Sequence, residues 1–312
     1  MLMNTIPGYY EQEPENNTFQ DVIIDVTHRC NMSCKNCYIP YRNVPDLDMD
    51  KMIDAISKFP KRTMIRIIGA EPTMRKDLPE MITRIKKTGN RCTLLTNGLR
   101  LAKDTYVKKL KKHGLTHCYL SMNGADNDDW YEEIDELRCA TKKVKALQNL
   151  KNNRFIIDTG TIVVKGINDD VIERMLSMFK RLGVEHVMSR IKNVGDIGRS
   201  MSDNDSGNYT MEQLIELASK QTGLSVDYIE SWRRKPIYQN TEPEVDSFIF
   251  PLKPEQEGKL LHKSGIWFKI ANWKGDEGQT IPLRNNRRRG RLTPQFKVAP
   301  FFEHVKMNEG GY

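Results

Sequence analysis

The sequence predicts an α/β fold: a partial (β/α)6 barrel of the TIM type, followed by a C-terminal α+β extension. From Gln20 onward, short β-rich runs alternate with amphipathic helical patterns, which is typical of βα units and a mainly parallel sheet. Six such units precede Arg199, whereas a closed barrel has eight. Residues 200–208 are rich in Ser, Asp, Asn and Gly and predict a linker. A chain of 312 residues has room for one barrel-sized domain and an appendage.

Six segments have the composition of strands: Asp21–Val26, Met64–Ile68, Cys92–Thr96, His117–Met122, Ile156–Val164 and His186–Ser189. Between them, apolar residues recur at steps of three and four, as on one face of a helix. These faces are Met52, Ile53, Ile56 and Phe59; Leu78, Met81, Ile82 and Ile85; Ile134, Leu137, Thr141, Val144 and Leu147; and Ile172, Met175, Phe179 and Leu182. We expect them to form the core rather than to contact a cofactor. In such a barrel, functional groups lie on the loops at the carboxyl ends of the strands.

Three parts are therefore predicted: an N-terminal segment (1–19), the barrel core (20–199), and a basic, aromatic C-terminal extension (200–312). Within the extension, helices are expected at Met211–Thr222 and Val226–Arg234. Strands are expected at Ser247–Leu252 and Ile266–Trp273.

The charge balance is basic, with 49 Lys and Arg against 41 Asp and Glu and a formal net charge of +8. Such a balance suits a polyanionic partner, such as a nucleic acid or a phosphorylated substrate, although an ordinary soluble basic protein has the same composition. No apolar run approaches the ~20 residues needed to cross a bilayer, and the polar N-terminus lacks a signal-peptide core. We therefore expect a cytoplasmic protein with no membrane partner.

Three of the six cysteines, Cys30, Cys34 and Cys37, lie on one short loop directly after the first predicted strand. Three thiolates on so short a loop can bind three irons of a cubane and leave the fourth iron without a protein ligand. A zinc site with His28 as the fourth ligand is the alternative. Structural zinc sites usually consist of two short ligand pairs, and no second pair follows here.

This CxxxCxxC loop resembles that of the radical S-adenosylmethionine (radical SAM) superfamily. The resemblance implies an enzyme with a [4Fe-4S] cluster whose open iron is chelated by the amino and carboxylate groups of S-adenosylmethionine. Reductive cleavage of that cofactor would give methionine and a 5′-deoxyadenosyl radical, which abstracts hydrogen from a substrate. A one-electron reductant such as flavodoxin or ferredoxin is implied as a partner. The resemblance extends over roughly Asp21 to Arg199.

A second segment, Gly69-Ala70-Glu71-Pro72, follows the second strand and resembles the GGEP motif of the superfamily, with Ala70 in place of the second glycine. In the family this motif binds the amino group of the cofactor methionine. Glu71 and the exposed backbone are the expected acceptors. Taken alone, the string is equally typical of a turn between a strand and a helix.

Further cofactor contacts are implied at the ends of the third and fourth strands, at Asn97, Ser121 and Asn123. The segment from Ser121 to Gly124 resembles the family's SxDG type, with Asn123 in place of Asp. Its side chains can hydrogen-bond ribose hydroxyls or the cofactor carboxylate. Each Asn-Gly pair alone is typical of an ordinary turn.

On the fifth strand, the resemblance implies that Val163 packs against adenine. Ser189 and Arg190 are expected to end the sixth strand, where Arg190 can pair with the cofactor carboxylate or remain a solvated charge at the rim. Family loops often carry an aromatic residue before the third cysteine, whereas this chain has Asn36 there and Tyr38 after the cysteine. Tyr38 is therefore included among the expected cofactor contacts.

No cysteine follows Cys139, which excludes a cysteine-ligated auxiliary cluster in the extension. Cys92, Cys118 and Cys139 are expected to be buried free thiols. The tail could bind phosphates and stack on bases, or form a solvated loop with its strand aromatics in the core. The residues concerned are Arg287, Arg288, Arg289 and Arg291, with Trp267, Trp273, Phe301 and Phe302.

The sequence thus predicts a radical SAM enzyme acting on a nucleic acid or nucleotide. A radical SAM enzyme that modifies a peptide or another small molecule is the alternative. A non-catalytic, metal-stabilised nucleic-acid-binding module is disfavoured by the barrel pattern and by the Gly69–Pro72 segment.

Overall fold

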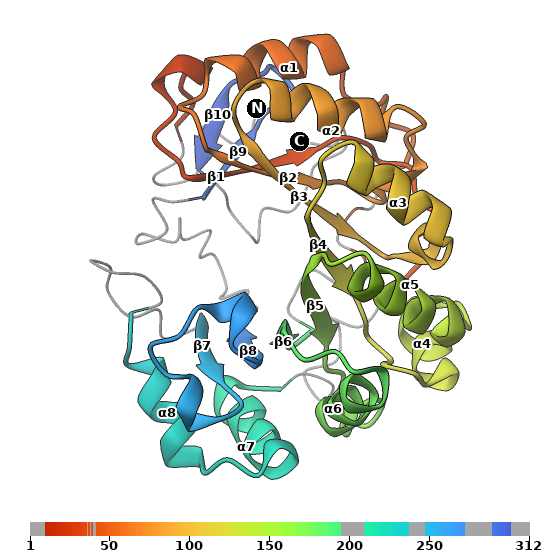
Figure 1. The fold of residues 1–312 in the computed structure, drawn as a ribbon, viewed down its shortest axis with the longest axis vertical. Helices are drawn as coiled ribbons and strands as arrows, with labels where there is room; N and C mark the ends of the chain where they lie inside the picture. The colour runs from red at the N-terminus through yellow and green to blue at the C-terminus, as the bar shows by residue number, and fades with distance from the viewer. Residues whose placement is uncertain are drawn as a thin grey trace.

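A ten-stranded sheet forms the centre of the computed structural model, which describes residues 10–35, 37, 39, 42–194, 209–236, 247–271 and 289–300. The strand order is β10-β9-β1-β2-β3-β4-β5-β6-β8-β7, so β10 and β7 are the two edges. Figure 1 shows the sheet curving as an open arc, with helices α1 to α6 along its outer side. The partial barrel expected from the sequence is confirmed.

The core of the barrel alternates strands with helices. In chain order it comprises β1 (Asp21–Asp25), α1 (Met49–Lys58), β2 (Met64–Ile68), α2 (Leu78–Lys87), β3 (Arg91–Thr96), α3 (Asp104–Lys112), β4 (His117–Ser121), α4 (Asp128–Asp135), α5 (Ala140–Asn152), β5 (Ile156–Ile162), α6 (Val171–Leu182) and β6 (Val187–Lys192). Strands β1 to β6 pair in parallel, each with the next. The expected strand positions are correct to within one or two residues, except at β6. That strand continues to Lys192, because it pairs there with both Ile162 and Ala271.

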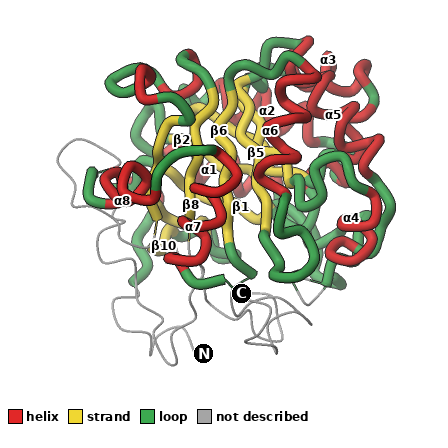
Figure 2. The backbone as a smooth tube through the Cα atoms, turned by 90° about the horizontal axis from the view of Figure 1, so that it is seen from below, coloured by secondary structure: helices red, strands yellow, loops and turns green. Residues whose placement is uncertain are grey.

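The extension lengthens this sheet at both ends. It comprises α7 (Met211–Thr222), α8 (Val226–Arg233), β7 (Ser247–Pro251), β8 (Ile266–Ala271), β9 (Arg289–Leu292) and β10 (Val298–Pro300). Strand β8 pairs in parallel with β6, and β9 pairs in parallel with β1. Figure 2, seen from below, shows α8 on the opposite side of the strands from α3 and α5. Helix α7 packs against α6 and β8 and so continues the outer layer of helices. None of the described helices combines the length and the apolar character needed to cross a bilayer.

Side chains alternate between the two faces of each strand. On β2, Ile65 and Ile67 are fully buried in the hydrophobic core under the helices. On β4, Cys118 and Leu120 occupy the same layer. The residues between them point to the inner side of the arc. Each strand therefore contributes apolar residues to the core and a separate set to the interior of the barrel.

One predicted helix is interrupted. The apolar series from Ile134 to Leu147 predicts a single helix, but α4 ends at Asp135 and α5 begins at Ala140. Glu136 ends α4 in the left-handed conformation, with a φ of 53°. Leu137 is consequently exposed rather than part of the core, which corrects the expectation for that residue. The break matters because it places Asp135 at the end of a helix, next to the cysteine loop.

The interior of the barrel is closely packed at Gly160 on β5. A Cβ atom at this position would lie 1.5 Å from the Tyr119 hydroxyl and 2.1 Å from its ring carbon Cζ. Only glycine leaves room for this tyrosine, which stands on the neighbouring strand β4, two residues before Ser121, the residue paired with Gly160. The position of the Tyr119 ring therefore depends on a missing side chain one strand away.

We expect Gly160→Ala to lower the free energy of unfolding by about 1–3 kcal/mol, because overpacking forces neighbouring groups to shift. The measurement is urea unfolding of the single variants, the double variant Tyr119→Ala/Gly160→Ala and the wild type. When Tyr119 is already Ala, Gly160→Ala should lower the free energy of unfolding only slightly. An equal cost in both backgrounds would show that the tyrosine is not the obstacle.

Candidate functional site

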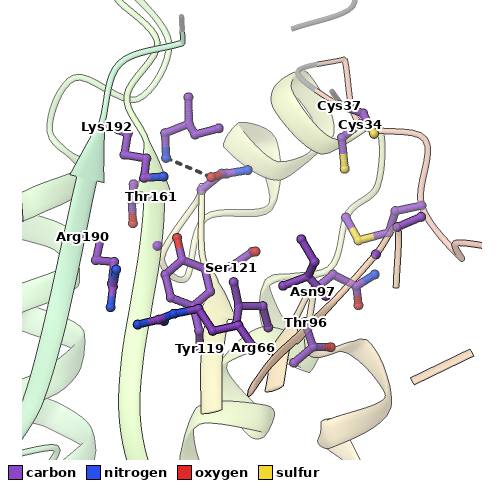
Figure 3. Close-up of a pocket in the computed structure, with 18 of the residues that line it drawn as sticks. Cys34, Cys37, Arg66, Thr96, Asn97, Tyr119, Ser121, Thr161, Arg190 and Lys192 are labelled. Carbon is purple, nitrogen blue, oxygen red and sulfur yellow. Dashed lines mark hydrogen bonds between the residues drawn. The ribbon is translucent and has the colours of Figure 1, made fainter. Parts of the chain in front are cut away.

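A cavity of about 310 Å³ lies inside the arc and is lined by residues from the cysteine loop, the core strands and the extension. This volume is typical of a small-ligand site. In Figure 3, Cys34 and Cys37 lie on one side of the cavity, and Arg190 and Lys192 lie on a strand on the other side. The cavity thus has a sulfur-bearing wall and a basic wall.

The three loop cysteines all line this cavity. Ligand atoms around one zinc ion stand about 3.8 Å apart, given Zn–S bonds of about 2.3 Å. Only one set of His, Cys, Asp and Glu ligand atoms in the described chain lies within 4.8 Å of one another, and it contains neither His28 nor a cysteine. The three sulfurs are spread more widely than a single zinc requires. Three thiolates are the donor set that a cubane with one open iron needs, and the binding of such a cluster by these residues stays a prediction.

Burial raises the pKa of the Cys30 and Cys34 thiols, and the nearby Asp135 carboxylate raises that of Cys34 further. Two cations act in the opposite direction, Arg42 on Cys30 and Lys143 on Cys34. Since iron binds thiolates, a cluster must displace these protons as it assembles. Hydrogen bonds also reach the sulfurs: Arg42 Nη2 donates to Cys37 Sγ at 3.0 Å.

The backbone after β2 forms hydrogen bonds with the segment that precedes Cys30. The Ala70 amide donates to the Thr27 carbonyl at 2.8 Å, and the Glu71 amide donates to the Arg29 carbonyl at 3.0 Å. Gly69 has a φ of 140°, and a Cβ atom there would lie 2.3 Å from the Thr27 oxygen. Glycine is therefore needed at the first position of the motif, and Ala70 is accommodated at the second. Both residues line the cavity, as expected for cofactor contacts.

Glu71 is fully buried and is not among the residues that line the cavity. Its Oε1 accepts hydrogen bonds from Thr73 N at 3.0 Å, Thr73 Oγ1 at 2.6 Å and Thr96 Oγ1 at 2.6 Å. Its Oε2 accepts from Asn97 N at 2.7 Å. The carboxylate thus holds together the ends of β2 and β3. A contact between Glu71 and the cofactor ammonium stays a prediction.

Asn97, Ser121 and Asn123 all line the cavity, as expected. The Asn123 side-chain amide already makes two hydrogen bonds within the protein. Its Oδ1 accepts from Ile162 N at 3.0 Å, and its Nδ2 donates to Asp135 Oδ1 at 2.8 Å. At the end of β5 the structure differs from expectation. Val163 lies in the hydrophobic core, and Ile162 lines the cavity in its place.

Three other expected contacts lie away from the cavity or outside the described residues. Pro72 is buried in the turn after β2. Ser189 is buried, and its hydroxyl accepts a hydrogen bond from Thr159 Oγ1 at 3.2 Å. Tyr38 lies outside the described residues.

Arg190 lies within β6, not at its end, and lines the cavity. Its Nη2 donates to Asp158 Oδ2 at 2.7 Å, and its guanidinium lies 5.4 Å from the centre of the Tyr119 ring. His262 Nε2 contacts the other oxygen of Asp158 at 2.7 Å, and His117 Nε2 lies 3.4 Å from Oδ2. Burial alone would raise the pKa of Asp158, but Arg190 and the two histidines outweigh it and hold that pKa well below its ordinary value. Arg190 is therefore a paired, positioned cation rather than a solvated charge at the rim.

The basic wall is the feature that the sequence analysis missed. Among the described residues lining the cavity, eight are cationic and only Asp135 is acidic. Arg42 and Lys143 lie beside the cysteines, and the other six form the basic wall: Arg66, Arg190, Lys192, Lys269, Arg289 and Arg291. Asp21 pairs with Arg66 at 2.6 Å and Asp25 with Arg291 at 3.1 Å, so part of this charge is balanced. Burial and the neighbouring Arg289 guanidinium lower the pKa of Arg66, as expected where cations crowd together.

Two of the tail arginines belong to this wall. Arg289 and Arg291 lie on β9 and line the cavity, which corrects the expectation of a basic loop at these positions. Trp267 is buried, as expected for a strand aromatic, and Cys92, Cys118 and Cys139 are confirmed as buried free thiols. The remaining tail residues singled out from the sequence lie outside the described residues: Arg287, Arg288, Trp273, Phe301 and Phe302.

Comparison with known proteins finds one matching family model and several similar proteins. The family model described as the radical SAM superfamily matches residues 24–179, half of the chain. The GTP 3′,8-cyclase of Aquifex aeolicus is 28% identical over 309 residues, which cover 88% of this chain and 95% of the cyclase. The 7,8-dihydro-6-hydroxymethylpterin dimethyltransferase of Methanocaldococcus jannaschii is 32% identical over 160 residues, covering 48% of this chain and only 31% of that protein.

Among solved structures, SuiB of Streptococcus suis bound to its precursor peptide SuiA is similar, with a TM-score of 0.62 and 12% identity. The match covers 95% of this chain and 62% of SuiB. SuiB has also been solved bound to S-adenosylmethionine. At this identity the likeness is one of fold.

We expect Glu71→Gln to destabilise the protein by about 1–3 kcal/mol, because its amide would leave buried donors at the ends of β2 and β3 without an acceptor. Urea unfolding measures the change. Glu80→Gln, on the exposed face of α2, is the matched control and should unfold like the wild type. Equal stability of both variants would mean that the Glu71 hydrogen bonds do not hold the strand ends together.

Proposed function

The chain belongs to the radical SAM superfamily, and from that premise we propose that it directs a 5′-deoxyadenosyl radical at a phosphate-bearing small molecule, with a nucleotide as the substrate class. As a member of this family it is an enzyme that uses a [4Fe-4S] cluster, S-adenosylmethionine and an external electron donor. That flavodoxin or ferredoxin is the donor stays part of the proposal.

In this proposal the sulfur-bearing wall holds both cofactors. Cys30, Cys34 and Cys37 bind the cluster, and together the cluster and S-adenosylmethionine supply the radical by reductive cleavage. The backbone of Gly69 and Ala70, with the side chains of Asn97, Ser121 and Asn123, supplies polar contacts to the cofactor from the ends of β2, β3 and β4. Ile162 supplies an apolar surface beside them. All of these groups line the same cavity as the cysteines.

The basic wall is the observation that carries the substrate class. Arginines and lysines from β2, β6, β8 and β9 converge on one cavity, although these strands come from distant parts of the sequence. Arginine side chains bind phosphate through paired, charge-assisted hydrogen bonds. A nucleotide places several negative charges on one small molecule. The similarity to proteins named GTP 3′,8-cyclase supports the same class.

A nucleic acid is less consistent with this wall than a nucleotide. Arg289 and Arg291 line a cavity inside the arc. Proteins bind the phosphate backbone of duplex nucleic acids through exposed basic surfaces instead. A peptide substrate is supported only by similarity of fold to SuiB. Eight cations around the cavity do not favour a neutral or basic peptide.

Anaerobically prepared protein is expected to carry about four irons per chain, since three thiolates on this loop suit one cubane. Replacing Cys30, Cys34 and Cys37 together by Ala should abolish the iron and, with a strong reductant, the formation of 5′-deoxyadenosine. Cys92→Ala, in the hydrophobic core, is the control and should keep both. Stoichiometric zinc without iron in iron-replete, anaerobic preparations would refute the cluster assignment.

GTP should bind the cluster-loaded enzyme with an affinity that falls as salt is added, because cations provide the contacts. The double variant Arg289→Gln/Arg291→Gln should weaken binding roughly 10-fold or more, given the strength of charge-assisted hydrogen bonds. Equilibrium dialysis measures the effect, and Arg138→Gln, exposed near α4, is the control. Unchanged GTP affinity in the double variant would remove the support for a nucleotide in this cavity.

A further inference from the structure

Two histidines and an aspartate meet at the end of the barrel opposite the cysteine loop. His117 is the first residue of β4, Asp158 lies near the start of β5, and His262 lies in the turn Leu261–Lys263 before β8. We propose that these three side chains bind a zinc ion, which joins the extension to the core strands. None of the three lines the cavity, and the proposed site rests neither on the cysteines nor on the proposed substrate class.

The ligand atoms stand close enough together for one ion. One nitrogen of each histidine and one oxygen of Asp158 lie within 4.8 Å of one another. His262 Nε2 lies 2.7 Å from Asp158 Oδ1, and His117 Nε2 lies 3.4 Å from Oδ2. Zinc bonds of about 2.0–2.2 Å to nitrogen and oxygen place the ligands of a tetrahedral site roughly 3.3–3.6 Å apart. A small shift of the His262 ring away from Oδ1 therefore gives the spacing of a zinc site.

Burial distinguishes this group from an ordinary cluster on the surface. The Asp158 side chain is 1% exposed, and the side chains of His117 and His262 are 16% and 24% exposed. His117 Nε2 is buried and has no hydrogen-bond partner among the described residues. A buried nitrogen without a partner is unfavourable, and a neutral imidazole offers a lone pair to a metal ion. Zinc at this position gives His117 Nε2 the partner that the protein does not supply.

The Asp158 carboxylate can serve two partners at once. Arg190 Nη2 donates to Oδ2 at 2.7 Å, which leaves Oδ1 for the ion. Carboxylates that bind metals are themselves hydrogen-bonded, and this second contact orients them. Arg190 therefore keeps its place in the cavity wall while the same carboxylate binds zinc at the amino end of the strands.

The donor set favours zinc over magnesium or calcium. Those two ions prefer sites built from oxygen ligands, whereas imidazole suits zinc and other divalent transition metals. Three protein ligands leave a fourth position, which water can fill because both histidines are partly exposed. The ligands come from β4, β5 and the turn before β8, so the ion ties that turn of the extension to the core of the barrel.

A hydrogen-bonded network without metal is the competing interpretation. In that network His262 Nε2 carries a proton and donates it to Asp158 Oδ1, whereas zinc requires the lone pair of the same nitrogen. Two substitutions separate these roles. In His262→Gln the side-chain amide can still donate a hydrogen bond but is a poor zinc ligand. In His262→Cys the thiolate is a good zinc ligand but the thiol is a weak donor.

The test uses cluster-loaded protein, in which iron occupies the loop cysteines. The protein is dialysed anaerobically against buffered zinc, and the zinc and iron bound per chain are measured by mass spectrometry. We expect one zinc per chain in the wild type, in His262→Cys and in the control His186→Gln, which changes an exposed histidine. His117→Gln and His262→Gln should each lose roughly 100-fold or more in zinc affinity, because loss of a metal's outer-shell partners alone costs about 10–100-fold. The iron content should not change.

X-ray absorption at the zinc edge of the wild type requires no variant to fold. Nitrogen and oxygen ligands at about 2.0–2.2 Å are expected, whereas sulfur at about 2.3 Å would assign the zinc to cysteines and overturn the proposal. A wild type that binds no zinc would overturn it as well. So would equal zinc affinity in His262→Gln and the wild type, and in either case the three side chains would form only a hydrogen-bonded network.

Discussion

The parallel pairing of β1 to β6 determines the position of every group in the cavity. Parallel strands in register bring their carboxyl ends to one edge, so the cysteine loop after β1, Gly69 after β2, Asn97 after β3 and Asn123 after β4 meet there. The alternation of side chains along each strand then separates the hydrophobic core from the interior of the barrel. The apolar side chains on the outer face pack against the helices and stabilise the fold, which leaves the inner face available for polar residues.

The inner face of the sheet carries many positive charges. Ion pairs with carboxylates reduce the repulsion among them. Asp21, Asp25 and Asp158 pair with Arg66, Arg291 and Arg190, respectively. Eight cations line the cavity against one acidic residue among the described residues, and this imbalance favours an anionic ligand there. At the sulfur-bearing wall, Asp135 and Lys143 are a local exception in which opposite charges stand apart. The two walls of the cavity therefore differ in charge.

Contiguous motifs could be predicted from the sequence because the chain itself holds their residues together. Cys30 to Cys37 and Gly69 to Pro72 are of this kind, and periodicity also predicts the six core strands. The basic wall depends instead on long-range pairing, since β9 brings Arg289 beside Asp21 at the other end of the chain. A charged residue inside an apolar strand, such as Arg66 in Met64–Ile68, was the available signal. At the end of β5, Ile162 faces the cavity and Val163 faces the core. Which of the two faces the cavity depends on the strand register, and similarity to a family motif does not specify that register.

If the radical source and an anionic substrate share one cavity, hydrogen moves from the substrate to 5′-deoxyadenosine, and isotope labelling detects this transfer. The reduced enzyme is incubated with S-adenosylmethionine and with nucleoside triphosphates that carry deuterium on carbon, and the 5′-deoxyadenosine is analysed by mass spectrometry. Deuterium from a nucleotide should appear in the 5′-deoxyadenosine, because the radical abstracts that atom. Transfer from a deuterated peptide, with none from any nucleotide, would show that the cavity does not serve a nucleotide substrate.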